Sequence, residues 1–165
     1  MAFERVPAVL LSVGVVLLVA VLAAHLGFLP APWSADRATV TVVAGDGTTK
    51  AVVDAEVADT PVERYVGLSD HDSLADGEGM LFVHGSEDER TYVMREMDFA
   101  IDVVFVGADG EITAIRHARA PDPGEDGEDL AYSGRAKWVL EVPRGYADER
   151  GIEAGDAVAI EYERS

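Results

Sequence analysis

Two acids in the stretch TYVMREMDFAIDVVFV, residues 91–106, could do chemistry, because paired carboxylates act as general acid and base. Strand alternation places Asp98 and Asp102 on one side of the chain, about 13 Å apart if the strand is fully extended. That distance exceeds the ~5.5 Å of a retaining glycosidase pair and the usual inverting range. As a lone pair, these two carboxylates therefore do not make acid–base machinery.

Asp102 is nevertheless costly among apolar neighbours, unless arginine or backbone groups donate hydrogen bonds to its carboxylate. We expect a buried structural Asp–Arg pair at this position, with a ligand-binding role as the alternative. Three arginines are candidate partners: Arg64, Arg95 and Arg116.

Histidine could add a metal site, but the histidines that follow residue 30 lie on separate segments without His-x-His spacing: His71, His84 and His117. The acidic segment 120–135 matches a calcium loop poorly, because the twelfth position counted from Asp122 is Ser133 instead of an acid. The sequence therefore predicts no metal and no cofactor. A metal-assisted hydrolase using Asp98, Asp102 and a histidine stays open as an alternative function.

Other catalytic signatures are missing from the sequence. It contains no G-x-S-x-G elbow, no H-E-x-x-H pair and no dinucleotide-binding fingerprint. The segment GDGTTK, residues 45–50, has the wrong spacing for a phosphate loop and is typical of a hairpin turn. We therefore predict no catalytic residues and favour a protein without enzymatic activity over an enzyme.

Charge is the strongest compositional signal. The chain carries 31 acidic and 13 basic residues, which give a formal net charge of −18. Such a surface suits high salt, where screening reduces self-repulsion, and it argues against nucleic acid as a partner. Cysteine is absent, which excludes disulfides and thiolate chemistry.

The first 29 residues predict a membrane segment. No formally charged residue occurs between Val6 and Leu29, and a helix of this length, at about 1.5 Å per residue, can cross a ~30 Å hydrocarbon core. A cleavable signal sequence usually has a shorter apolar region of about 7–15 residues, so we favour an anchor and keep cleavage as the alternative. We expect a single-pass protein of the cell membrane with its domain outside the cell. The reverse orientation stays open, because flanking charges are few.

After a Pro-rich linker at residues 30–37, the remaining chain, 38–165, predicts one domain of short strands. The expected strands are 38–44, 51–58, 79–84, 91–95, 99–107, 111–119, 136–142 and 156–163. A short helix is expected after Thr60, which is an N-cap that forms a capping box with Glu63. A second helical turn is expected at 143–151, and 120–135 is a long acidic loop. The fold class is α+β, mostly antiparallel: a small barrel-like domain with two short helices, preceded by one transmembrane helix.

Four motifs occur in order between residues 63 and 158: ERYVGLSDHDSL, GEGMLFV, YVMREMDFAIDVVFVGADGEI and WVLEVPRGYADERGIEAGDAV. Together they resemble DUF192, a family of unknown function, and the acidic composition behind an apolar segment resembles its haloarchaeal members. The resemblance implies a compact, mostly β-barrel-like fold and supplies no catalytic residues. The positions that match the family pattern are Arg64, Gly67, Leu68, Gly79, Met80, Leu81, Phe82, Met94, Asp102, Glu141, Gly145, Gly151, Gly155 and Asp156.

We therefore expect a membrane-anchored, extracytoplasmic module that binds a small ligand or an envelope protein. An accessory scaffold subunit at the membrane is a further alternative. Met80, Phe82, Met94 and Arg95 could line a small apolar cleft. The full set of candidate binding residues is Arg64, Met80, Phe82, Met94, Arg95, Asp102 and Asp156.

Overall fold

The structure, a computed structural model, describes residues 36–163, which lie in one compact unit from Ala35 to Ser165. The expected anchor at 1–29 and most of the expected linker at 30–37 lie outside the described residues. Within the described part, no helix has the length and apolarity that a membrane crossing requires.

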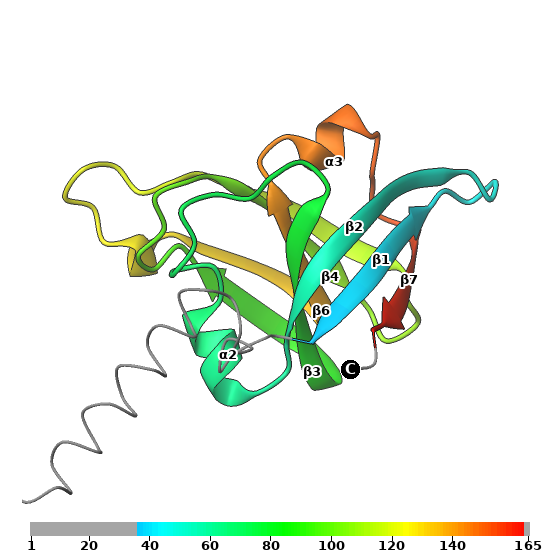
Figure 1. Cartoon of the computed structure of the whole chain (residues 1–165), viewed down its shortest axis with the longest axis horizontal. Coiled ribbons are helices and arrows are strands. Elements are labelled where there is room, and N and C mark those ends of the chain that lie inside the picture. The colour runs from blue at the N-terminus through cyan, green and yellow to red at the C-terminus, as the bar shows by residue number, and fades with distance from the viewer. Residues whose placement is uncertain (1–35, 164–165) are drawn as a thin grey trace, which may run out of the picture. The chain divides into compact units, whose positions relative to one another are not determined.

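Seven strands form one sheet in the order β5-β4-β6-β3-β2-β1-β7 (Figure 1). The strands are β1 (Arg37–Val43), β2 (Thr49–Ala58), β3 (Glu78–Val93), β4 (Ile101–Val106), β5 (Ile112–Ala118), β6 (Ala131–Pro143) and β7 (Ala157–Tyr162). The helices are α2 (Pro61–Val66) and α3 (Tyr146–Glu149), with a 3₁₀ turn, η1 (Gly127–Asp129). Neighbouring strands are antiparallel except β2 and β3, which run parallel and are joined through α2. The predicted mostly antiparallel sheet with two short helices is confirmed.

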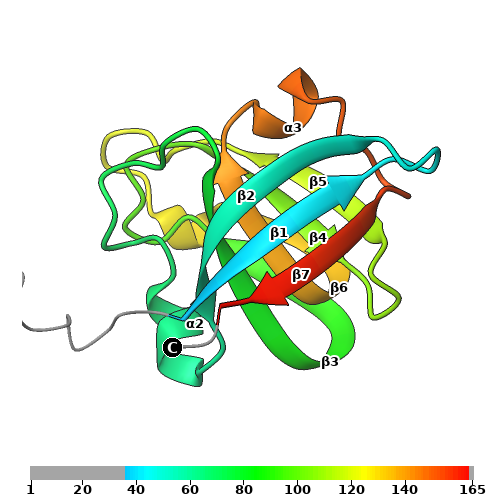
Figure 2. The same ribbon diagram turned by 45° about the vertical axis from the view of Figure 1, so that its right-hand side comes forward.

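The sheet curls so that β2, β1 and β7 face β4 and β5 (Figure 2). It does not close, so the predicted barrel is wrong on this point: its edges, β5 and β7, meet through the single bridge between Glu111 and Ala157. Further along β5, side chains donate hydrogen bonds to the first half of β6 instead, from Thr113 to the Arg135 carbonyl and from Arg116 to the Ser133 carbonyl. The rest of β5 therefore lies against β6. Beyond the bridge, the outer edge of β7 does not pair with β5.

β4 is buried along its whole length and separates two hydrophobic clusters. Val104 and Val106 pack in the first cluster, which the curled sheet encloses. Ile101, Val103 and Phe105 pack in the second, on the opposite face. This is the two-residue alternation of a strand with both faces covered, and burial of each such side chain stabilises the fold by about 1.5–3 kcal/mol. The apolar stretch is thus a core strand, as its sequence predicts.

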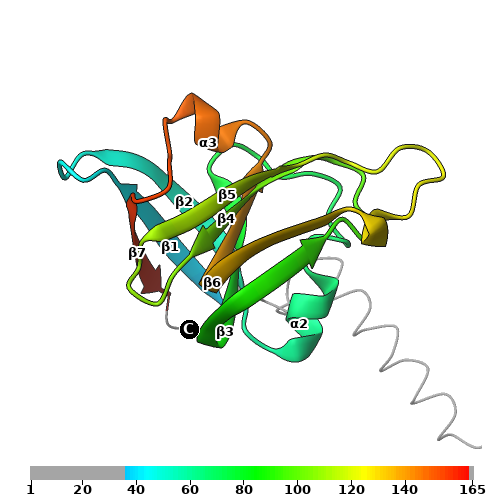
Figure 3. The same ribbon diagram turned by 180° about the vertical axis from the view of Figure 1, so that it is seen from behind.

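The two strands beside this core are longer than their sequences predict. β3 continues without interruption from the expected strand at 79–84 to the one at 91–95, with a register shift between Val83 and Asp88. β6 begins at Ala131, so the expected loop at 120–135 ends earlier and contains the η1 turn. Figure 3 shows β3 and β6 side by side beyond the main body of the sheet. This extension forms because the two strands satisfy each other's backbone hydrogen-bonding groups.

The short helix α2 forms for the local reasons visible in its sequence. The Thr60 side chain accepts a hydrogen bond from the Glu63 amide, and the Glu63 side chain accepts one from the Thr60 amide, which confirms the capping box. The helix buries none of its residues, and Val62 and Tyr65 are 72% and 67% exposed. α2 is therefore held by its caps and its neighbours' polar contacts, because it has no buried apolar face.

Candidate ligand-binding cavity

Two acids lie buried on neighbouring central strands and face opposite sides of the sheet. Asp102 of β4 is fully buried and pairs in register with Val142 of the first hydrophobic cluster. Glu141 of β6 is 6% exposed and lies in register between Met80 and Val103 of the second cluster. Burying a carboxylate is costly unless hydrogen bonds compensate, so the partners of each acid indicate its role.

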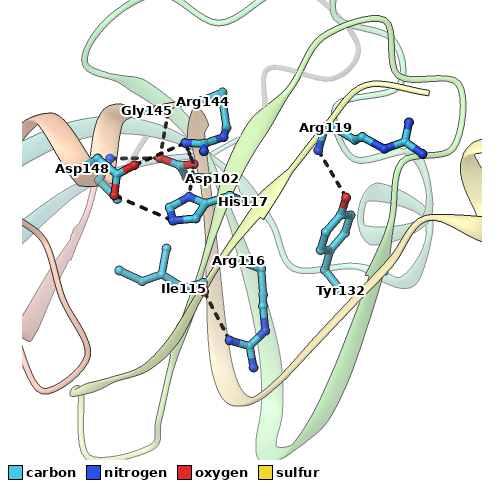
Figure 4. Close-up of polar contacts among 10 residues, drawn as sticks. Asp102, Ile115, Arg116, His117, Arg119, Tyr132, Arg144, Gly145 and Asp148 are labelled. Atoms are coloured by element: carbon cyan, nitrogen blue, oxygen red, sulfur yellow. Dashed lines mark hydrogen bonds and ion pairs between the residues drawn. The ribbon is translucent and has the colours of Figure 1, made fainter. Parts of the chain in front are cut away.

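The Asp102 carboxylate is completely satisfied (Figure 4). Its Oδ1 lies 2.7 Å from Nδ1 of His117 and accepts a hydrogen bond from Nη1 of Arg144 at 3.0 Å. Its Oδ2 accepts from the backbone amides of Gly145 and Ala147 at 3.0 and 3.1 Å. These four contacts fix the start of α3 against β4 and β5. The arrangement is that of a structural anchor, since no oxygen is left for a ligand.

The expected pairing of Asp102 with an arginine is therefore present, but Arg144 is the partner instead of the three arginines proposed from the sequence. Asp98 is exposed and lines a separate hollow beside residues 121–125. Among residues 36–163, no group of three or more acids and histidines has the geometry to hold a metal ion. Asp98 and Asp102 are thus not brought together at one site.

Glu141 presents the opposite case. Its carboxylate receives no hydrogen bond and forms no ion pair within the described part of the chain. It lines a cavity of about 380 Å³, so its polar atoms retain contact with that space. Burial raises the pKa of the Glu141 carboxyl from its ordinary 4.5 to about 8, and the group is therefore neutral near pH 7.

The interior wall of this cavity is largely apolar. Leu68, Phe82, Met97 and Ile101 line it, and all four are buried in the second hydrophobic cluster. The mouth is formed by α2 and by the turn after it, where Gly67 has a φ of 53°. A Cβ at this glycine would lie 3.3 Å from the Phe82 ring, so a side chain here would be strained and would crowd the cavity.

Two polar rings also line the cavity. The His84 Nε2 lies 2.9 Å from the Tyr92 hydroxyl, and the Tyr92 ring packs edge-on against Phe82 with centroids 4.9 Å apart. Burial, together with the charges of Arg90 and Arg64, lowers the pKa of His84 to about 4. Burial and the nearby Glu141 raise the pKa of Tyr92. Both rings are therefore neutral near pH 7 and can take part in hydrogen bonding without carrying charge.

Three arginines line the cavity as well: Arg64, Arg90 and Arg95. Arg64 donates through Nη1 to the carbonyls of Asp59 and Val83. Arg95 stacks on the Tyr65 ring at 4.2 Å and pairs with Glu128 at 2.5 Å, which ties α2 to the η1 turn. The cavity thus combines an apolar wall, a neutral carboxyl group, cationic groups and one exposed acid, Glu89.

The structure distributes the seven sequence-proposed binding residues over four places. Arg64, Phe82 and Arg95 line the cavity. Met80 and Met94 are buried in the same hydrophobic cluster without lining it. Asp102, with its partners His117, Arg144, Gly145 and Ala147, forms the structural contact described above, which we call the α3 anchor. Asp156 lies at the start of β7, where it pairs with Lys50 Nζ at 2.8 Å and accepts a hydrogen bond from the Glu153 amide.

Several cavity residues lie outside the binding set proposed from the sequence, among them His84, Arg90, Tyr92 and Glu141. Glu141 had a recognisable signal, because it is the one acid in the apolar run WVLEV, as Asp102 is in IDVVFV. His84, Arg90 and Tyr92 had none, because a polar residue on a strand near a bend is ordinarily a surface residue.

The fold and this cavity define a small α+β domain built on an open, curled sheet, with a ligand-sized hollow beside its first described helix. The chain belongs to the DUF192 family, described as "Uncharacterized ACR", whose sequence profile matches residues 41–160. No protein of curated function matches it.

Two crystal structures share the fold. A protein of unknown function from Novosphingobium aromaticivorans DSM 12444 is 32% identical, with a TM-score of 0.67, over 79% of this chain and 91% of that chain. A proposed transcription regulator from Sinorhizobium meliloti 1021 is 24% identical, also with a TM-score of 0.67, over 76% of this chain and 93% of that chain. The second likeness concerns the fold alone.

Proposed function

We propose that the domain is a binding module for a small ligand, which occupies the cavity lined by Glu141. The observation that carries this proposal is the Glu141 carboxyl group, which has no partner among residues 36–163 and faces a cavity of about 380 Å³. A carboxyl group on a residue that is only 6% exposed, with a strongly raised pKa and a cavity in front of it, is typical of a functional site. The volume lies within the range of small-molecule sites, about 300–1,000 Å³, and the mixed apolar and polar lining suits one.

We also propose that residues 1–29 anchor this module in the cell membrane, with the domain outside the cell. The support is the uncharged apolar run from Val6 to Leu29. Cell fractionation tests this directly: the full-length protein should sediment with membranes and be digested by protease added to intact cells. A domain released into the medium with a new N-terminus near residue 30 would mean cleavage instead.

The binding proposal is tested by asking what the protein retains. Full-length protein is exposed to extract of its own host, repurified in mild detergent, and denatured to release small molecules for mass spectrometry. Ser69→Trp places a large ring at the cavity mouth, and Asp70→Trp places the same ring on the next residue, which does not line the cavity. We expect one compound to be retained by the wild type and by Asp70→Trp and to be lost from Ser69→Trp. Equal retention by both variants would contradict the proposal.

A further inference from the structure

The arginines of the cavity differ from the other arginines of this acidic protein. Of the nine arginines in residues 36–163, six form ion pairs with Asp or Glu: Arg37, Arg95, Arg119, Arg135, Arg144 and Arg150. Arg64, Arg90 and Arg116 form no ion pair with an acid of residues 36–163, and two of these three line the cavity. In a chain with 31 acids, guanidinium groups without a carboxylate partner are unexpected at a partly enclosed site.

Neutral backbone carbonyls orient both groups and leave their charge uncompensated. Arg64 donates through Nη1 to the Val83 carbonyl at 3.0 Å, and Arg90 donates through Nη2 to the Ser86 carbonyl at 2.6 Å. Neither Nε nor Nη2 of Arg64, nor Nη1 of Arg90, has a partner within the described residues. The effect of both charges reaches the interior, since they contribute to the low pKa of His84.

We propose, on the basis of the binding function above, that the ligand is a small organic carboxylate with an apolar body. Arg64 and Arg90 compensate its charge, Glu141 donates a hydrogen bond to it, and Leu68, Phe82 and Met97 contact its apolar part. This assignment gives each unusual group of the cavity a partner. It requires Glu141 to carry its proton, and burial favours this because it raises the pKa of the carboxyl group to about 8.

Other ligand charges fit the same groups less well. An ammonium ligand would meet two like charges and would need an ionised Glu141. A strongly hydrated inorganic anion such as phosphate would gain nothing from the buried apolar wall. An uncharged ligand would leave both guanidinium groups without a counter-charge.

Three probes with the same phenyl ring and different charges separate these cases: benzoate, benzamide and benzylammonium. Full-length protein in mild detergent, labelled with ¹³C at the methionine methyl groups, reports binding through Met97, which lines the cavity. We expect benzoate to shift the Met97 signal and to bind about tenfold or more tightly than benzamide, because a charge-assisted hydrogen bond is lost in the amide. Benzylammonium should bind more weakly still.

Matched variants assign the contacts. Arg64→Gln should weaken benzoate binding about tenfold or more, whereas Arg116→Gln, which removes the unpaired arginine outside the cavity, should not change it. Benzoate affinity of the wild type should fall as the pH rises above about 8, where Glu141 loses its proton. Glu141→Gln keeps a donor that does not titrate and should abolish this fall, and Glu141→Leu should weaken binding at every pH.

The outcomes separate the two proposals. If benzamide or benzylammonium shifts Met97 and binds as tightly as benzoate, the carboxylate assignment is wrong and the binding site stands. Phenylacetate and hexanoate, two further carboxylates with apolar bodies, are tested in the same way. If none of these compounds perturbs Met97, both proposals are overturned. Thermal unfolding of each variant identifies any loss of binding that arises from loss of the fold.

Discussion

Glu141→Gln should make the ligand-free protein more stable, by an amount that grows with pH. The carboxyl group is buried in the second hydrophobic cluster without a partner, so the folded state disfavours its ionised form. A glutamine has almost the same shape and never ionises. Substituting it removes the cost of ionisation from the folded state while it leaves the packing of Met80 and Val103 nearly unchanged.

The magnitude follows from the pKa of the carboxyl group. Burial raises it from 4.5 to about 8 in the folded state, and each tenfold change in an equilibrium corresponds to about 1.4 kcal/mol, so the complete effect is about 5 kcal/mol. The pKa of Glu141 is higher in the folded state than in the unfolded state. The stability that the protonated Glu141 contributes is therefore fully present below pH 4.5. It is lost progressively as the pH rises to about 8.

The assay is denaturant unfolding of the wild type and the variant at a series of pH values between 5 and 9, at constant high salt. We expect the difference in free energy of unfolding between them to be small near pH 5 and to reach several kcal/mol near pH 9. Glu89→Gln, at an exposed acid that lines the same cavity, is the control and should show no such trend. A wild type and a Glu141→Gln variant whose stabilities change in parallel across this range would refute the reasoning.

Three further predictions concern the surroundings of the cavity and of the α3 anchor. Asp102→Asn should lower the free energy of unfolding by about 1–3 kcal/mol, because it places an amide where a fully buried carboxylate accepts four hydrogen bonds, while the partner Arg144 is 40% exposed. Asp148→Asn on the exposed side should change it by less than about 0.5 kcal/mol. His84→Phe should reduce the fall in the free energy of unfolding between pH 6.5 and pH 4. The pKa of His84 is lowered from 6.5 to about 4 in the folded state, so the stability that the neutral ring contributes is present above pH 6.5 and lost as the pH falls towards 4. Thr60→Ala should cost about 1 kcal/mol in chemical denaturation, whereas Thr60→Ser, which preserves the cap, should cost little.

The features that the sequence predicted correctly are local ones. The capping box at Thr60 depends on residues within one turn, and the burial of β4 depends on an uninterrupted apolar run. The cost of burying Asp102 is likewise a local inference, since apolar neighbours along the strand indicate it. All three features can therefore be inferred without knowing which distant segments of the chain meet.

The features that the sequence missed depend on contacts between distant segments. Arg144 lies 42 residues from Asp102, and only the docking of α3 brings the two together. Whether the sheet closes depends on how two edge strands separated in sequence diverge after Glu111 and Ala157. The cavity itself forms where α2, β3 on both sides of its register shift and the C-terminal end of β6 meet. No periodicity in the sequence indicates that these segments come together.

The two buried acids also differ in a way that the sequence alone could not predict. Asp102 and Glu141 carry the same signal in sequence, a single acid in an apolar strand. One of them accepts four hydrogen bonds and the other accepts none within the described residues. Only the structure distinguishes the acid that holds the fold together from the acid that is available to a ligand.

The most direct test of the account is the titration of the Glu141 carboxyl group by ¹³C NMR, with and without benzoate, assigned by the signal that disappears in Glu141→Gln. We predict a titration midpoint near pH 8 in the free protein, which moves to higher pH when benzoate binds, because a ligand that accepts its proton in a hydrogen bond stabilises the protonated form. A midpoint near the ordinary 4.5 that benzoate leaves unchanged would contradict the assignment of Glu141 as the group that faces the ligand.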